Sequence, residues 1–169
     1  MEIKKKYNWK ISYETTLPIS KKKLWKIISS PKNLELYHPF CKKNPILKWP
    51  GINSVDQVHY FNKLIYERKF INWIENVGYD LLIGEKNKIQ SFVSWRIYDL
   101  ENKSKLIISI YPYIFNMNYK FLNFLPFIFF VKPSLKKYLS SISKGLLFYI
   151  KEKKTVKKNQ FGSHKWFSN

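Results

Sequence analysis

Cysteine, histidine and glycine are scarce in this sequence of 169 residues. Cys41 is the single cysteine, which excludes an intramolecular disulfide framework and a multi-cysteine metal site. The three histidines, His38, His59 and His164, lie in separate segments and lack the spacing of a metal site. The five glycines are scattered, so no glycine-rich phosphate loop is present. We therefore predict no metal and no cofactor. No carboxylate is placed to orient His38 beside Cys41, which favours an unreactive cysteine and no catalytic residue.

Acidic residues and arginine are also few. Eleven acidic residues oppose 31 basic ones, the formal net charge is +20, and only Arg68 and Arg96 are arginines. A strong positive charge is typical of proteins that bind nucleic acid or an anionic membrane. Nucleic-acid sites usually use the planar guanidinium of arginine, and the lysines here are scattered. An anionic membrane surface therefore stays a candidate partner, and nucleic acid is the weaker expectation.

Long apolar runs are missing as well. The first ten residues contain no apolar core of signal-peptide length, and the most apolar stretch, residues 114–131, is interrupted by Asn, Lys and Pro. We expect a cytoplasmic protein that can also sit peripherally at a membrane. A chain of this length is most simply one domain. We place that domain at residues 1–154, as a monomer, followed by a basic tail at residues 155–169.

The longest periodic pattern lies near the C-terminus. Apolar residues recur there at helical spacing and predict one amphipathic helix over residues 133–154. Short helices are predicted at residues 21–29 and 32–37. Alternating patterns predict strands at residues 7–16, 46–49, 56–61, 64–73, 79–84, 89–100 and 105–113. This order indicates an α+β fold with a curved antiparallel sheet of six to seven strands around the long helix.

The aromatic segment 114–131 has two interpretations. In the structural interpretation it covers one end of the sheet. In the functional interpretation it either forms a lid over an apolar cavity, with Phe121, Phe124 and Phe127, or dips into a membrane. The tail ends in Trp166 and Phe167, and paired aromatic residues are rare in disordered tails. We expect the tail to dock on the domain.

Several short motifs are similar to those of the SRPBCC (START-like) superfamily. They are residues 17–25 (LPISKKKLW), 28–40 (ISSPKNLELYHPF), 49–51 (WPG), 56–60 (DQVHY) and 95–98 (WRIY), and the closing helix around 139–149. In order and spacing the chain resembles the polyketide-cyclase/dehydrase and lipid-transport branch over residues 8–153. The resemblance implies a helix-grip fold, in which a curved sheet and the long helix enclose a cavity for an apolar small molecule. Relatives bind lipids, sterols, quinones or polyketides, and only some are enzymes.

Strand alternation suggests which side chains face such a cavity. Burying Glu67 and Lys69 would be costly, so we place the other face of residues 64–73 inside. This face carries both arginines if the neighbouring strands follow it. The predicted cavity residues are His59, Phe61, Tyr66, Arg68, Phe70, Phe92, Ser94 and Arg96 from the strands, with Ile142, Gly145 and Leu146 from the helix. Gly145 is expected to let the ligand or the sheet approach the helix closely.

The arginines allow two roles, and the protein allows three functions. Arg68 and Arg96 either anchor an anionic ligand group or form structural salt bridges, for instance with Asp56, Glu75 or Asp99. We predict binding or transport of a hydrophobic small molecule or lipid, without catalysis. One alternative is a polyketide cyclase/dehydrase-type enzyme with His59 as base. A second is a basic interaction module that contacts RNA or an anionic membrane.

Overall fold

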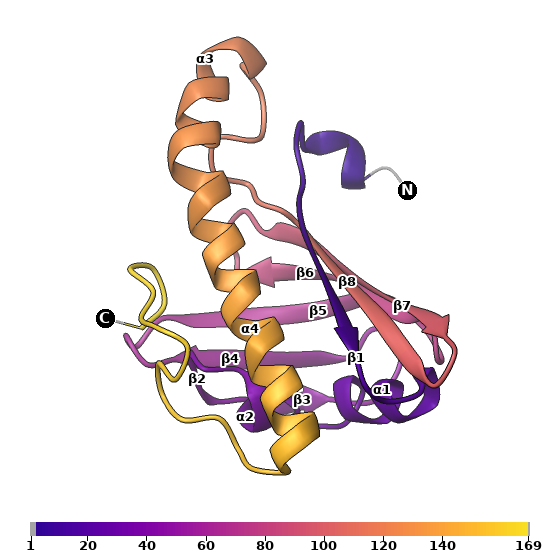
Figure 1. Ribbon diagram of the computed structural model, residues 1–169. Coiled ribbons are helices and arrows are strands. Elements are labelled where there is room, and N and C mark those ends of the chain that lie inside the picture. The colour runs from indigo at the N-terminus through magenta and orange to yellow at the C-terminus, as the bar shows by residue number, and fades with distance from the viewer. Residues whose placement is uncertain (1–2, 169) are drawn as a thin grey trace.

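The computed structural model describes residues 3–168, which form an eight-stranded antiparallel sheet with one long helix across it (Figure 1). The strands are β1 (Ile11–Leu17), β2 (Cys41–Lys43), β3 (Ile46–Lys48), β4 (Val55–Tyr60), β5 (Ile65–Ile74), β6 (Gly78–Gly84), β7 (Ser91–Leu100) and β8 (Lys103–Tyr111). Their order in the sheet is β1-β8-β7-β6-β5-β4-β2, and β3 pairs with β4. The sheet twists strongly and bends around the helix, which confirms the predicted fold class.

The predicted strands differ substantially from the observed ones at two places, and the other bounds agree within two residues. The first begins at Ile11 rather than Tyr7, because the backbone of Asn8 and Trp9 bonds to Asn116 instead of to a neighbouring strand. The eighth strand, β2, was not predicted. Its three residues are too few for alternation to be visible in the sequence.

The short helices occupy the predicted places. The 3-10 turn η1 (Ile3–Lys6) opens the described chain, and α1 (Lys21–Ile28) and α2 (Leu34–Tyr37) follow β1. Ser20 caps α1 by accepting a hydrogen bond from the backbone N–H of Lys23. The apolar side of α1, with Leu24 and Ile28, is fully buried in the core.

The long helix α4 (Lys132–Glu152) buries the predicted apolar stripe and ends at Lys153, which adopts a left-handed conformation. Two helical segments precede it without a break, α3 (Lys120–Pro126) and the π-helical turn η2 (Phe127–Val131). The segment 114–131 is therefore mostly an extension of the long helix. Figure 1 shows that this extension projects beyond the sheet at the end where α3 lies.

Gly145 is the point where α4 comes closest to α2. A Cβ atom at this position would lie 2.0 Å from the backbone oxygen of Tyr37, closer than two such atoms can approach. Gly145 therefore packs against the end of α2. We had predicted that the ligand or the sheet would approach the helix at this position. Glycine is required here because the backbone at the end of α2 lies so close to α4 that no room remains for the methyl group of alanine.

We expect Gly145→Ala to lower the free energy of unfolding by about 1–3 kcal/mol, the usual cost of overpacking a core. Alanine favours a helix by about 1 kcal/mol over glycine, so the clash acts against a gain in propensity. Urea denaturation measures the difference. Lys144→Ala, one residue away on the exposed side of α4, is the matched control. A Gly145→Ala protein more stable than wild type would show that α2 yields without cost.

Candidate functional site

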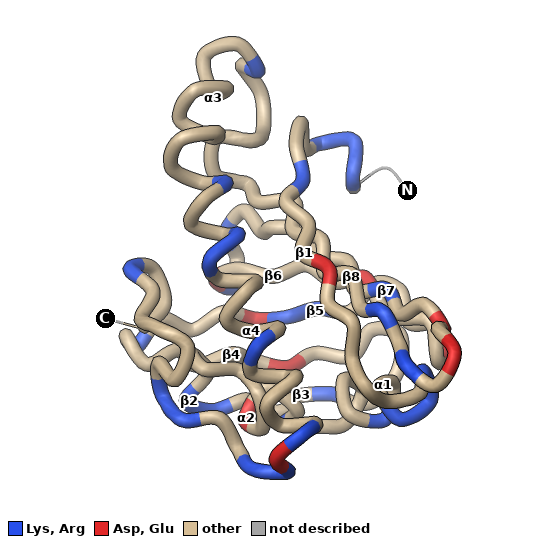
Figure 2. Tube along the Cα trace, viewed as in Figure 1, with Lys and Arg blue, Asp and Glu red and all other residues tan. Residues whose placement is uncertain are grey.

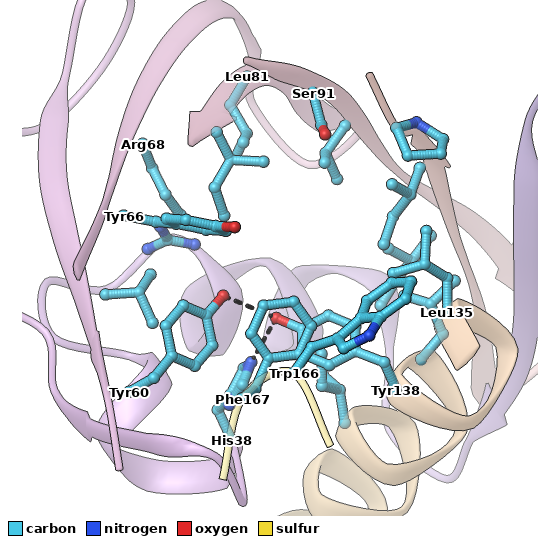
Figure 3. Close-up of a pocket in the computed structure, with 18 of the residues that line it drawn as sticks. His38, Tyr60, Tyr66, Arg68, Leu81, Ser91, Leu135, Tyr138, Trp166 and Phe167 are labelled. Atoms are coloured by element: carbon cyan, nitrogen blue, oxygen red, sulfur yellow. Dashed lines mark hydrogen bonds between the residues drawn. The ribbon is translucent and has the colours of Figure 1, made fainter. Parts of the chain in front are cut away.

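A cavity of about 220 Å³ lies between the inner face of the sheet and α4 (Figure 3). Every strand from β4 to β8 contributes to its wall, together with α4, the turn after β8 and the C-terminal tail. Most of the lining side chains are aliphatic or aromatic, among them Leu81, Val93, Ile110, Leu135 and Leu139. The cavity is therefore suited to an apolar guest, with few places where a polar group finds a partner.

Most of those places gather at one end. Figure 3 shows Tyr60, Tyr66 and Arg68 on one side of the cavity, and the hydroxyl group of Tyr138 reaches from α4 towards Tyr60 and His38. His38 Nε2 lies 2.9 Å from the hydroxyl oxygen of Tyr138, and that oxygen lies 3.1 Å from the hydroxyl oxygen of Tyr60. We call these five residues the polar end of the cavity.

The histidine of the polar end is neutral, and its tautomer follows from its partners. Burial, with a smaller contribution from the charge of Arg68, lowers the pKa of His38 to about 3. The backbone N–H of Phe40 donates to His38 Nδ1 at 3.2 Å, so Nδ1 carries no proton. The proton of the neutral ring is then on Nε2, which donates to the hydroxyl oxygen of Tyr138.

A count of hydroxyl protons shows a donor left over. Tyr60 and Tyr138 have two hydroxyl protons and share one hydrogen bond. His38 cannot accept the second proton, because its Nε2 is a donor. Burial raises the pKa of both tyrosines, so they stay protonated. One hydroxyl proton of the pair is therefore available to a ligand in the cavity.

Arg68 adds charge to this end but is held by an ion pair. Its Nε donates to Asp56 at 2.7 Å, and its Nη2 donates to the second carboxylate oxygen. Arg68 is 3 % exposed and Asp56 is fully buried, so the pair is desolvated. Within residues 3–168, only Nε and Nη2 of Arg68 donate to protein acceptors at hydrogen-bond distance, and the buried hydroxyl of Tyr79 lies near the guanidinium. The structural role proposed for this arginine, a salt bridge to Asp56, is confirmed, and Nη1 remains as a second donor for a guest.

The C-terminal tail closes one side of the cavity. Phe167 stacks on Tyr60 with ring centroids 4.7 Å apart, and Trp166 lines the cavity beside it. His164 Nε2 lies 3.0 Å from the backbone oxygen of Ser134, which ties the tail to the first turn of α4. The tail lies against the domain, as its paired aromatic residues predicted.

Three of the predicted cavity residues line the cavity: Tyr66, Arg68 and Ile142. The placement of His59 and Phe61 in the wall was wrong. Cross-strand partners share a face of a sheet, and Tyr66 pairs with Val58, not with His59. His59 therefore points to the opposite face, where its Nε2 lies 2.9 Å from Gln57 Oε1. Phe61 follows the end of β4 and lies under the ammonium of Lys158.

Phe92, Ser94 and Arg96 were also placed on the wrong face of their strand. The wall residues of β7 are the alternate ones, Ser91, Val93 and Trp95. Phe92 is covered by Tyr111 and by Lys4 on the outer face. Both terminal nitrogens of Arg96 are engaged on the outer face: Nη2 donates to Asp80 at 2.7 Å, and Nη1 donates to the backbone oxygens of Tyr79 and Trp95. The two arginines thus lie on opposite faces of the sheet.

The remaining predicted residues are buried elsewhere or exposed. Phe70 belongs to an aromatic cluster with Trp49, Trp73 and Tyr79. Leu146 is in the core, and Gly145 faces α2. The three lid residues do not line the cavity: Phe127 packs on Trp9, and Phe121 and Phe124 are exposed on α3. They form no lid in this structure.

Sequence reasoning missed His38, Tyr60, Tyr138 and the aromatic pair of the tail. Tyr60 alternates with Val58, so the correct face of β4 would have identified it, and Tyr138 could have been read from the apolar stripe of α4. His38 lies in the turn after α2, where no periodic pattern indicates a direction. Across residues 3–168, no three His, Cys, Asp or Glu side chains come together as metal ligands, and no helix is long and apolar enough to cross a membrane.

Comparisons with known proteins identify the fold. No family model matches the sequence, and no curated protein sequence matches it significantly. A START superfamily protein from Mycobacterium smegmatis has a similar structure, with a TM-score of 0.62 and 11 % identity over 85 % of this chain and 97 % of that one. Ara h 8.0201 is also similar in structure, with a TM-score of 0.61 and 17 % sequence identity over 85 % of this chain and 98 % of that one. DynU16, from the dynemicin biosynthetic locus, gives 0.66 and 9 % over 86 % of this chain, which spans about half (48 %) of that longer chain.

The chain therefore has the START-like helix-grip fold of the SRPBCC superfamily, as its motifs suggested. The identities are low enough that they establish the fold alone.

Proposed function

We propose that this protein binds a hydrophobic small molecule or lipid that carries one hydrogen-bond acceptor, in the cavity between the sheet and α4. The observation that supports this proposal is the contrast between a largely apolar wall and one polar end with unused donors. A guest with a carbonyl, carboxylate or phenolic oxygen would satisfy the leftover hydroxyl proton and Nη1 of Arg68. A purely aliphatic guest would leave both donors buried without a partner, which costs binding free energy.

The size of the cavity limits the guest. An apolar cavity of about 150 Å³ can hold benzene, and drug-sized ligands occupy roughly 300–1,000 Å³. A cavity of about 220 Å³ thus suits a compact guest, such as a small ring system or the end of an acyl chain. Binding needs no catalytic base. The base of the cyclase alternative, His59, lies on the outer face, and His38 uses Nε2 as a donor.

A paired substitution on β6 tests the proposal with an anilinonaphthalene sulfonate dye as probe. Ile83 lines the cavity beside Arg68, and Leu82 points to the opposite face. We expect Ile83→Trp to fill the cavity and to weaken dye binding about tenfold or more, because the apolar contacts of the dye are lost. Leu82→Trp should leave the affinity unchanged. Thermal unfolding of both variants verifies that they fold.

Equal affinities for Ile83→Trp and wild type would place the dye elsewhere and overturn the proposal. Native mass spectrometry of the purified protein provides a second test. A stoichiometric co-purified mass that disappears in Ile83→Trp but persists in Leu82→Trp would support binding in the cavity and give the class of the natural ligand. A mass retained by both variants would argue against this cavity as its site.

A further inference from the structure

The extension before α4 carries an unusual amount of exposed apolar surface. We call residues 115–130 the apolar tip. Eight of its large apolar side chains are between 47 and 92 % exposed: Phe115, Tyr119, Phe121, Leu122, Phe124, Leu125, Phe129 and Phe130. Four of them, Phe121, Leu122, Leu125 and Phe129, follow one another at helical spacing and form a stripe. Soluble proteins seldom expose so much contiguous apolar surface without a partner.

Specific hydrogen bonds hold the apolar tip in this position. Asn116 is fully buried, and its side chain bonds to both backbone groups of Trp9. Asn123 donates to the backbone oxygens of Met117 and Asn118. Phe115 and Tyr119 adopt left-handed conformations, which are rare for bulky residues and are kept only where the surroundings impose them. These hydrogen bonds and backbone conformations therefore hold the aromatic side chains of the tip in exposed positions.

The charge around the apolar tip is positive. No acidic residue occurs between Asn102 and Lys151; Lys120 lies within the tip at the start of α3, and Lys132 follows the tip where α4 begins. Figure 2 shows the lysines of the N-terminal segment beside the base of the tip and no acidic residue on it. The contact of Trp9 with Phe124, at 6.0 Å between ring centroids, confirms that this segment lies next to the tip. An apolar stripe that projects beyond a lysine-rich base matches one leaflet of an anionic bilayer, in which the acyl chains lie beneath a layer of phosphates.

We infer that the apolar tip inserts into the surface of an anionic lipid bilayer. The helical part, Lys120–Val131, is about 18 Å long at about 1.5 Å per residue, shorter than the roughly 30 Å of a hydrocarbon core, so it dips into one leaflet. Ile114 and Val131 flank the tip on both sides and also line the cavity. Insertion would therefore bring the wall of the cavity to the membrane surface. The inference does not depend on the cavity having a natural ligand.

Flotation with vesicles tests the inference on the full chain. Wild type is mixed with phosphatidylcholine vesicles that either contain or lack phosphatidylserine. We expect wild type to bind the mixed vesicles. The double variant Phe121→Ser/Phe129→Ser should have a partition coefficient lower by about tenfold or more, because two apolar side chains no longer enter the lipid. Leu47→Ser/Ile52→Ser removes two apolar side chains outside the tip that are also largely exposed (59 and 61 %), and it should bind as wild type does.

Each other outcome contradicts insertion. If the tip variant binds as well as wild type and binding vanishes between ~0.1 M and ~1 M salt, the contact is electrostatic only, as for a protein that binds RNA or lipid phosphates through lysine. If light scattering shows a wild-type dimer that the tip variant converts to a monomer, while neither binds vesicles, the tip is an interface between two copies of this chain.

Discussion

Replacing Arg68 with methionine is expected to lower the free energy of unfolding by about 3–5 kcal/mol. The substitution leaves the Asp56 carboxylate fully buried without the two hydrogen bonds that Arg68 donates. A buried charge without a partner is costly because neither water nor the protein solvates it. Chemical denaturation of the two proteins at neutral pH measures the loss.

Two further variants test whether the loss of stability comes from the unpaired charge and whether its burial sets the size of the loss. The double variant Asp56→Leu/Arg68→Met leaves no unpaired charge and should recover most of the lost stability. Arg96→Met removes the other arginine, whose side chain is 26 % exposed and whose partner Asp80 keeps the hydrogen bond that Asn72 donates. We expect that variant to lose only about 1 kcal/mol. Similar losses for Arg68→Met and Arg96→Met would contradict the argument that burial makes the Asp56 pair costly to break.

Acidification is expected to destabilise the protein by about 3 kcal/mol between about pH 7 and pH 4 through His38 alone, with about two thirds of that loss reached near pH 5. The pKa of His38 falls from its ordinary 6.5 to about 3 in the folded protein, mainly because the ring is buried. Below pH 6.5 His38 binds a proton in the unfolded chain but stays neutral in the folded protein. Stability therefore falls as the pH is lowered through this window, and it is fully present above it.

The measurement is the free energy of unfolding as a function of pH for wild type and for His38→Asn. The variant should have a much shallower slope between pH 7 and pH 5, a window above the ordinary range of carboxylates. Burial also lowers the pKa of His164, so a smaller slope of the same sign should remain. Equal slopes in the two proteins would show that His38 is protonated in the folded state or reaches water.

The local predictions succeeded where a pattern repeats within one element. The apolar stripe of α4 and the alternation in β1 and in β4 to β8 extend over enough residues to define their periods. The failures came where a face depends on another strand. A bulge between Phe70 and Asn72 moves Asn72 to the outer face, where it donates to Asp80, while Trp73 turns inward to stack on Tyr79. One extra residue reverses a face, and no single-strand pattern reveals it.

The candidate site shows the same division. Tyr66 and Arg68 were found from the sequence because the opposite face of their strand carries Glu67 and Lys69, which are costly to bury without partners. His38, Tyr60, Tyr138 and Phe167 come from a turn, a strand, a helix and the tail, and each looks ordinary by itself. Their roles arise from distances of about one hydrogen bond or one ring contact between positions far apart in the chain.

By itself, the sequence determined the long helix, the short helices and seven of the eight strands, their order and the helix-grip fold, because these depend on local periodicity and on short motifs in a consistent order. It also determined which stretches carry excess apolar surface. Only the tertiary structure decided which face of each strand meets α4, that the two arginines lie on opposite faces, and that the apolar tip projects away from the cavity. These features depend on strand register, on the close approach of α4 to α2 at Gly145, and on the bonds of Asn116 to Trp9. Each joins residues far apart in the chain, so its energy has no counterpart in any local pattern.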